Sequence, residues 1–219
     1  MLTSNHISAN YYDISLSNRI SSVLDKMNEL YSKQLAVVDQ GIYYGLIDED
    51  QLCDQANTDL NLEALKHLFQ FIYIFDYQHI YDALPLMVLN NLCIVPVVDK
   101  NLTYLGTLTR ESLLADLNSK IGKPDAAIIC IELGAYDHSL SHISRIIEAE
   151  NTAIYSSTIH QIPNSTKLEL TLQVNKANIS AVVAALWRHD YQIKATFGES
   201  YDQSTIQSRY DHLMNYLDM

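Results

Sequence analysis

Two stretches of the chain place side chains that can form hydrogen bonds at the same point of a repeated pattern. The stretch GTLTRES carries Thr109 and Ser112 after an apolar run, and GLIDEDQ carries Asp48 and Gln51 after a similar run. Thr109 and Asp48 lie where a helix is expected to begin, so both are good candidates for helix N-caps. A hydroxyl at a helix start can also donate a hydrogen bond to a phosphate, whereas a carboxylate would repel it.

Both stretches belong to a unit that occurs twice, about sixty residues apart. The matched pairs are Ile14 and Ile74, Val37 and Val97, Tyr44 and Tyr104, and, after a slip of one residue, Gly45 and Gly106. Hydrophobic periodicity predicts the element order β-α-β-β-α in each unit. The helices and strands of the two units should therefore hold the two stretches in equivalent positions.

The expected elements carry four features that a structure can check. Ser17 is the expected N-cap of the first helix, and Gly45 within a strand indicates close approach of a backbone or a ligand. Pro85 falls in the second unit's helix, so that helix should kink there or begin with an irregular turn. Residues 57–70 suggest a further short helix. The spacing of six residues predicts the buried face of the first helix: Ile20, Val23, Leu24, Met27, Leu30 and Tyr31.

The last third of the chain has a different pattern. Strand and helix runs after residue 125 follow the order βαββαβ, which predicts a ferredoxin-like sandwich. Gly122-Lys123-Pro124 is the clearest boundary signal before it. We therefore expect domains at 1–120 and 125–200. A final amphipathic helix is expected at 203–219, with one apolar face made of Ile206, Tyr210, Leu213 and Leu217.

Composition limits the partners. The 219 residues include 26 acidic and 14 basic ones, for a formal charge of −12, and 48% are hydrophobic. Such a chain can bury two cores, but it lacks the clustered cations that bind a nucleic-acid backbone or an anionic membrane. The sequence shows neither a signal-peptide pattern nor an apolar run approaching the roughly 20 residues of a membrane span. We therefore expect a cytoplasmic protein with no nucleic-acid or membrane partner.

No arrangement of residues in the sequence indicates catalysis. GxSxG, P-loop and GxGxxG motifs are absent, and the cysteines, Cys53, Cys93 and Cys130, form no CxxC pair. His138 and His142 are spaced to lie on one helical face, but the sequence offers no third ligand, so no metal site is predicted. We expect a protein that is not an enzyme and needs no cofactor.

The duplicated pattern resembles the cystathionine-β-synthase (CBS) domain pair, also called the Bateman module. The resemblance covers roughly residues 7–117, with repeats at about 7–57 and 70–118, and rests on the ordered set of a helix, the VVD strand, a turn and a glycine-containing strand. It implies an α/β fold of tandem CBS domains. It also implies that an adenine nucleotide binds between the repeats, with a hydroxyl near the phosphate and a carboxylate on the ribose.

Carried onto this chain, the resemblance defines two sites. The second-repeat site consists of Ile94, Gly106, Thr109, Arg110 and Ser112, in which Ser112 replaces the usual ribose carboxylate. The first-repeat site consists of Gly45, Asp48 and Gln51, and it is degenerate because Asp48 replaces the hydroxyl and Gln51 replaces the carboxylate. The expected ligand is AMP, ADP or ATP at the second-repeat site. Helix capping alone would also explain Thr109 and Asp48.

After such a pair, the βαββαβ segment resembles an ACT domain, and the combination resembles the acetoin-utilisation AcuB type of CBS–ACT protein. Gly134 lies where ACT domains that bind amino acids usually carry a glycine, and Asp137 follows it as a helix cap. The resemblance implies a homodimer that regulates an unknown protein, with an effector site in the ACT-like domain. The alternative is an interaction module whose ligand sites are degenerate.

Overall fold

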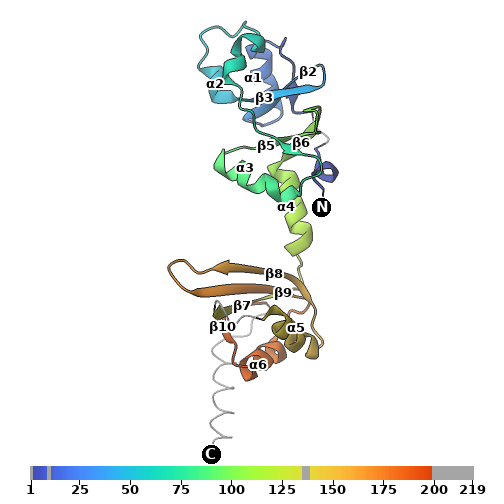
Figure 1. Cartoon of the computed structure of the whole chain (residues 1–219), viewed down its shortest axis with the longest axis vertical. Coiled ribbons are helices and arrows are strands. Elements are labelled where there is room, and N and C mark those ends of the chain that lie inside the picture. Colours follow the sequence, from blue (N-terminus) through green and yellow to red (C-terminus); the bar gives the residue numbers. More distant parts are fainter. Residues whose placement is uncertain (1, 9–10, 135–138, 199–219) are drawn as a thin grey trace, which may run out of the picture. The chain divides into compact units, whose positions relative to one another are not determined.

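The computed structural model describes residues 2–8, 11–134 and 139–198. The chain divides into two compact units, Met1–Asp116 (unit 1) and Leu117–Met219 (unit 2). Unit 1 holds two three-stranded sheets, and unit 2 holds one four-stranded sheet (Figure 1). The fold is therefore mixed α/β, as the sequence predicted.

Unit 1 contains the two predicted repeats and two short 3-10 helices, η1 (Thr3–His6) and η2 (Leu62–Leu68). The elements of the first repeat are β1 (Asp13–Ile14), α1 (Ile20–Glu29), β2 (Gln34–Asp39), β3 (Ile42–Asp48) and α2 (Glu49–Cys53). Those of the second are β4 (Ile74–Phe75), η3 (Ile80–Asp82), α3 (Ala83–Leu89), β5 (Ile94–Val98), β6 (Tyr104–Thr109) and α4 (Arg110–Ile121). The order β-α-β-β-α is confirmed in both repeats, and η2 supplies the short helix expected within residues 57–70.

The two repeats share their strand register. In each, the first strand runs parallel to the second, with Ile14 opposite Val37 and Ile74 opposite Val97. The next two strands are antiparallel, and each pair has a bulge directly after Val37 or Val97. This shared irregularity is independent evidence that the chain contains a duplicated unit.

The match of Tyr44 with Tyr104 is wrong. Val38 pairs with Tyr43 and Val98 pairs with Tyr104, so Tyr43 is the structural counterpart of Tyr104. The extra residue of the second repeat therefore lies in its hairpin turn, before the tyrosine, where an insertion leaves the strand pairing intact. The match of Gly45 with Gly106 is correct, since they pair with Val37 and Val97.

The predicted start of the first helix is also wrong. The N-cap of α1 is Arg19, which makes no side-chain capping bond, rather than Ser17. A helix start needs partners for its free N–H groups. Here the backbone supplies one, because the Ile20 N–H donates to the carbonyl of Leu60 at 3.0 Å. A contact distant in sequence therefore replaces the local cap.

The helix faces are mostly as predicted. Ile20, Val23 and Met27 are buried on α1, but Tyr31 is 97% exposed and has a φ of 50° just after the helix, so its place on the buried face is wrong. In the second repeat the irregular first turn is confirmed, since η3 precedes α3. Pro85 is then the third residue of α3, where a missing N–H removes no intrahelical bond.

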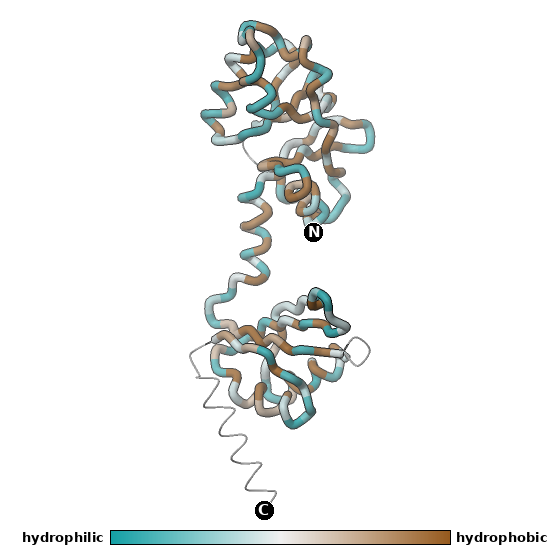
Figure 2. The backbone as a smooth tube through the Cα atoms, turned by 90° about the vertical axis from the view of Figure 1, so that its left-hand side faces the viewer, coloured by the Kyte–Doolittle hydropathy of each residue, from teal (hydrophilic) through white to brown (hydrophobic). Residues whose placement is uncertain are grey.

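A single core fills unit 1 and draws on both repeats. In Figure 2 the tube of this unit alternates between brown, hydrophobic stretches and teal, hydrophilic ones. The largest fully buried side chains include Ile20, Met27, Leu35, Leu46, Ile47, Leu62, Ile74, Ile80 and Ile94. Because the core draws on elements of both repeats, neither repeat can bury its hydrophobic face alone.

Unit 2 confirms the βαββαβ order. Its elements are β7 (Ala127–Gly134), α5 (Leu140–Ala149), β8 (Ile154–Gln161), β9 (Lys167–Val174), α6 (Ser180–Arg188) and β10 (Gln192–Phe197). The antiparallel sheet has the order β10-β7-β9-β8, and both helices cover one of its faces (Figure 1). A separate core forms between that face and the helices. Asp137, His138 and the predicted helix at 203–219 lie outside the described residues.

The structure motivates a prediction about the domain boundary. The core of unit 1 includes no residue beyond Leu113 among the described residues, although α4 runs on to Ile121. We therefore expect residues 1–120 to fold without the rest of the chain. Far-ultraviolet circular dichroism of this fragment should show a cooperative thermal transition, with the full-length protein as the control. A gradual loss of signal would contradict the boundary at residue 120.

Candidate functional site

In the second-repeat site, β6 and α4 hold Thr109 and Ser112 together. Thr109 ends β6, opposite Ile94 at the start of β5. The Ser112 N–H donates to Thr109 Oγ1 at 3.1 Å, and the Thr109 N–H donates to Ser112 Oγ at 3.1 Å. This reciprocal pair confirms Thr109 as a helix cap. A hydroxyl oxygen that accepts a hydrogen bond keeps its own proton for donation, so capping and contact with an anion are compatible.

Arg110 lies at the start of α4 but is anchored away from Thr109. Its Nε donates to the Leu92 carbonyl at 2.7 Å, and its Nη2 donates to Asn91 Oδ1 at 3.3 Å. The side chain also lines a cavity of about 380 Å³ between α3 and α4. The structure therefore keeps the positive charge near the helix start while fixing the guanidinium on the loop before β5.

The two strand glycines make room for the chain itself. Both have positive φ, 147° at Gly45 and 144° at Gly106. A Cβ at Gly45 would lie 2.8 Å from Phe69 Cβ and 3.2 Å from the Gln70 carbonyl, and one at Gly106 would collide with a methyl group of Ile7. The expected close approach at Gly45 is thus made by backbone. The segment that leads into the second repeat packs against Gly45, and the segment that leads into the first repeat packs against Gly106.

The first-repeat site is a closed hydrogen-bonded network. Asp48 caps α2, because its Oδ1 accepts from the Asp50 N–H at 3.0 Å and its own N–H donates to Gln51 Oε1 at 3.1 Å. Gln51 Nε2 donates to the Leu68 carbonyl at 3.1 Å. The predicted capping role of Asp48 is confirmed, and Gln51 completes the capping box.

Sequence reasoning missed Gln34, which joins this network to the other repeat. Gln34 Nε2 donates to Asp48 Oδ2 at 2.6 Å, and Gln34 Oε1 accepts from the Cys93 N–H at 2.9 Å. The side chain is buried, with 4% of the residue exposed. An available signal was that Gln34 opens the apolar run QLAVV where its counterpart, sixty residues on, is Ile94.

The helices that follow the two sites differ in length and charge. α4 has 12 residues and begins with Arg110 and Glu111, whose charges cancel, whereas α2 has five residues and begins with Glu49 and Asp50. A helix N-terminus attracts an anion through its free N–H groups and its dipole, and acidic side chains there oppose that attraction. The second-repeat site is therefore the better place for a phosphate.

The buried Tyr43 and the partly buried Tyr104 support the hairpins of the sites. Tyr43 donates its hydroxyl proton to the Ile72 carbonyl at 2.6 Å, and the Tyr104 hydroxyl lies 2.7 Å from Thr107 Oγ1. Burial raises the pKa of both phenols above the usual range. Both tyrosines are therefore neutral hydrogen-bonding groups at physiological pH.

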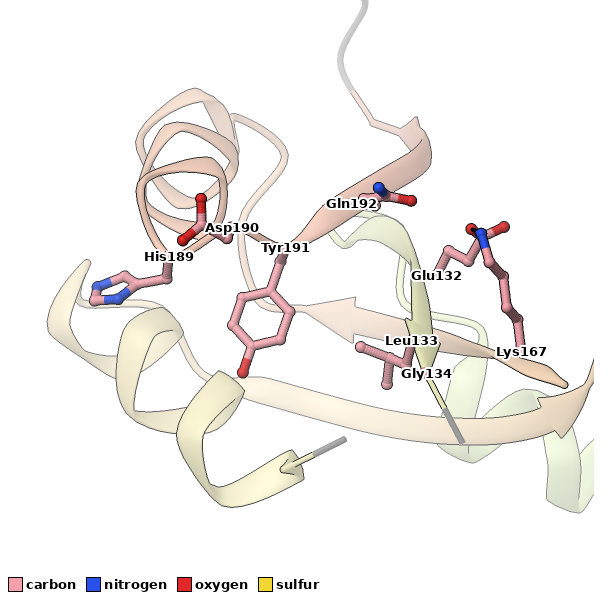
Figure 3. A pocket seen from close by; sticks show the side chains of 8 residues that line it. All are labelled: Glu132, Leu133, Gly134, Lys167, His189, Asp190, Tyr191 and Gln192. Atoms are coloured by element: carbon pink, nitrogen blue, oxygen red, sulfur yellow. Dashed lines mark hydrogen bonds and ion pairs between the residues drawn. The ribbon is translucent and has the colours of Figure 1, made fainter. Parts of the chain in front are cut away.

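Unit 2 contains a cavity of about 410 Å³ at the carboxyl end of β7 (Figure 3). Gly134 lines it, together with a Glu132–Lys167 ion pair and the residues that lead from α6 into β10. In Figure 3, His189 lies on one side of Tyr191, and Glu132 and Lys167 lie on the other. Burial raises the pKa of the Tyr191 phenol. Acidic, basic and aromatic groups thus surround one space.

His142 lies close to this cavity. Its Nδ1 is 2.8 Å from the Tyr191 hydroxyl, and its ring lies 5.3 Å from that of His189, centroid to centroid. In the part of the chain that the structure describes, no group of three or more His, Cys, Asp or Glu side chains could hold a metal ion. Within those same ranges, no helix combines the length and the apolar character that crossing a membrane requires.

Comparison with known proteins identifies the second repeat. The family model of the CBS domain matches residues 67–119. No curated protein matches the chain. The match to the CBS domain covers the second repeat, and the first repeat shares the element order and the strand register of the second. Proteins with CBS domains are generally regulatory rather than catalytic.

Several solved structures are similar to parts of the chain. A CBS domain pair/ACT domain protein from Thermotoga maritima is 18% identical, with a TM-score of 0.49 over 54% of this chain and 98% of that chain. The CBS domains of a transcriptional regulator from Streptococcus pneumoniae are 16% identical, with a TM-score of 0.46 over 52% and 98%. CBSX2 in complex with AMP is 18% identical, with a TM-score of 0.45 over 54% and 96%.

Proposed function

We propose that this chain is a cytoplasmic, non-catalytic regulatory protein that senses an adenine nucleotide at its second-repeat site. The observation that carries the proposal is the difference between the two helix starts. Thr109 presents a hydroxyl at the start of the 12-residue helix α4, whereas Asp48 places a carboxylate at the start of the five-residue helix α2. A nucleotide phosphate is favoured by the first arrangement and repelled by the second.

The expected affinity is modest. Ser112 stands where the CBS resemblance implies a carboxylate, and one hydroxyl holds a ribose diol less well than a carboxylate does. The formal charge of −12 further disfavours highly charged ligands. We therefore expect AMP or ADP to bind more tightly than ATP.

The test is isothermal titration calorimetry of the full-length protein with AMP, ADP and ATP. We expect one equivalent of AMP or ADP per chain and weaker binding of ATP. A thermal-shift series with the same nucleotides provides a second readout. If none of them produces heat or a shift, nucleotide sensing is wrong, and an interaction module with degenerate sites replaces it. The reciprocal capping of Thr109 and Ser112 is the observation that favours this alternative.

A second effector is proposed for unit 2, as an ACT-like domain. Its supporting observation is the cavity of about 410 Å³, where the Glu132–Lys167 pair could meet the ammonium and carboxylate groups of an amino acid. Gly134 lies at that cavity, as the ACT resemblance expects. An AcuB-type role in acetoin utilisation belongs to the same proposal. A thermal-shift screen of the full-length protein against amino acids tests this proposal.

We also predict a homodimer. Val88, Leu89 and Leu114 on α3 and α4 are 76%, 82% and 64% exposed. Val88 and Leu114 line the apolar cavity of about 380 Å³. Exposed apolar residues grouped in this way are typical of an interface. Size-exclusion chromatography with light scattering should give a dimer for the wild type and a monomer for Leu114→Glu. Tyr31→Glu, at an exposed residue just after α1, should remain dimeric. A monomeric wild type at micromolar concentration would contradict this prediction.

A further inference from the structure

We propose that Gln34 keeps the first-repeat site from binding a nucleotide and so restricts binding to one site per chain. This inference rests on the proposed function, because it names the residue that limits nucleotide binding to the second-repeat site. The inference goes beyond repulsion by the Asp48 carboxylate, because it predicts that removing this carboxylate alone does not allow a nucleotide to bind.

The contacts of Gln34 bind the two repeats together at the first-repeat site. Its carboxamide donates to Asp48 Oδ2 at 2.6 Å and accepts from the Cys93 N–H, at the edge of β5, at 2.9 Å. Both ends of the side chain are therefore engaged, and the residue is only 4% exposed. A buried carboxamide with both ends satisfied resists displacement, because a ligand would have to replace both bonds.

The second repeat has no equivalent connection. Gln34 lies opposite Asp48 in the β2–β3 pair, and Ile94 lies opposite Thr109 in the β5–β6 pair, so Gln34 and Ile94 are counterparts. An isoleucine side chain can neither donate to the residue opposite nor accept from a backbone N–H. Two paired differences, glutamine in place of isoleucine and aspartate in place of threonine, thus separate the bonded cap of α2 from the cap of α4.

The remaining polar groups of the first-repeat site depend on the same network. Asp48 Oδ2 is engaged by Gln34, and Asp48 Oδ1 is engaged by the Asp50 N–H. Gln51 is engaged by the Asp48 N–H and the Leu68 carbonyl. In the Asp48→Thr variant the bond between Gln34 and Cys93 is expected to persist, so the glutamine still occupies the space beside the new hydroxyl.

The experiment measures how many equivalents of AMP bind per chain, by calorimetry on full-length proteins. Asp48→Thr alone should bind the same number as the wild type. Gln34→Ile combined with Asp48→Thr copies the second repeat at this pair of positions and leaves Glu49 and Asp50 in place, so it should bind one equivalent more, with lower affinity than the second-repeat site. Gln34→Met with Asp48→Thr repeats the test at nearly constant side-chain volume, in case the isoleucine variant does not fold. Gln40→Met, at an exposed turn residue, is the matched control and should leave the number unchanged.

The outcomes separate this inference from the proposed function. If the wild type binds no AMP but a double variant binds one equivalent, nucleotide sensing by the natural protein is wrong and the role of Gln34 stands. If a folded double variant binds the same number as the wild type, the role of Gln34 is wrong. An extra equivalent in Asp48→Thr alone would also overturn it, because the charge would then be the sole barrier.

Discussion

Replacing Thr109 by aspartate is expected to abolish nucleotide binding at the second-repeat site. The substitution brings the charge of the first repeat to the start of α4. At an effective dielectric constant near 20 and a separation of about 4 Å, two like charges repel by about 4 kcal/mol before salt screening. That energy corresponds to roughly a thousandfold weaker binding. Raising the salt concentration should reduce the difference between the variant and the wild type.

The variant changes charge and stability together, so both are measured. One oxygen of the aspartate can cap α4 as Asp48 caps α2. Thr109 is 5% exposed and lies opposite Ile94, which cannot satisfy the second oxygen, so the thermal midpoint of Thr109→Asp should fall, and binding is measured well below that midpoint. Thr109→Ser is the matched control, since it retains the hydroxyl and should retain binding. Unchanged AMP affinity in Thr109→Asp would exclude Thr109 from any phosphate contact.

Local sequence patterns predicted the repeats well because helices, strands and helix caps depend on residues that are close together in the chain. The apolar spacing of α1 and the strand patterns identified elements that the core then confirms, as Ile20, Val23 and Met27 show by their burial. The capping residues were equally readable, because Asp48 and Thr109 make bonds within three residues of their own positions. Such contacts depend on the local chain alone.

Contacts between segments that are distant in the chain could not be predicted from local sequence patterns. Ser17 was the better local cap, yet α1 takes a partner from Leu60, which no local pattern encodes. Gln34 was unremarked because its two partners, Asp48 and Cys93, lie 14 and 59 residues away. The hairpin insertion was placed one residue late because two consecutive tyrosines, Tyr43 and Tyr44, match Tyr104 equally well by type.

Replacing Gly45 by alanine is expected to produce a much larger loss of stability than replacing Gly41 in the same repeat. Its φ of 147° strains a residue that carries a Cβ, at about 1–3 kcal/mol. The new Cβ would also lie 2.8 Å from Phe69 Cβ and 3.2 Å from the Gln70 carbonyl, and such crowding costs about 1–3 kcal/mol more. Neither neighbour can rotate away, because one is fixed to the backbone and the other belongs to it. We expect a loss of about 3 kcal/mol or more in the free energy of unfolding.

Gly106 and Gly41 provide controls for that prediction. At Gly106 the φ is 144° and the added Cβ would collide with the Cγ2 methyl of Ile7, which is bonded to a branched and rotationally stiff Cβ, so the loss should be similar to that at Gly45. At Gly41 the φ is 82° and no atom lies within 4 Å of the added Cβ, so strain alone should cost about 1 kcal/mol. Urea unfolding of the three alanine variants measures the order. Equal losses at Gly45 and Gly41 would mean that the Phe69–Gln70 segment does not pack against β3. Contact with that segment would then not be the reason why the first repeat needs a glycine at position 45.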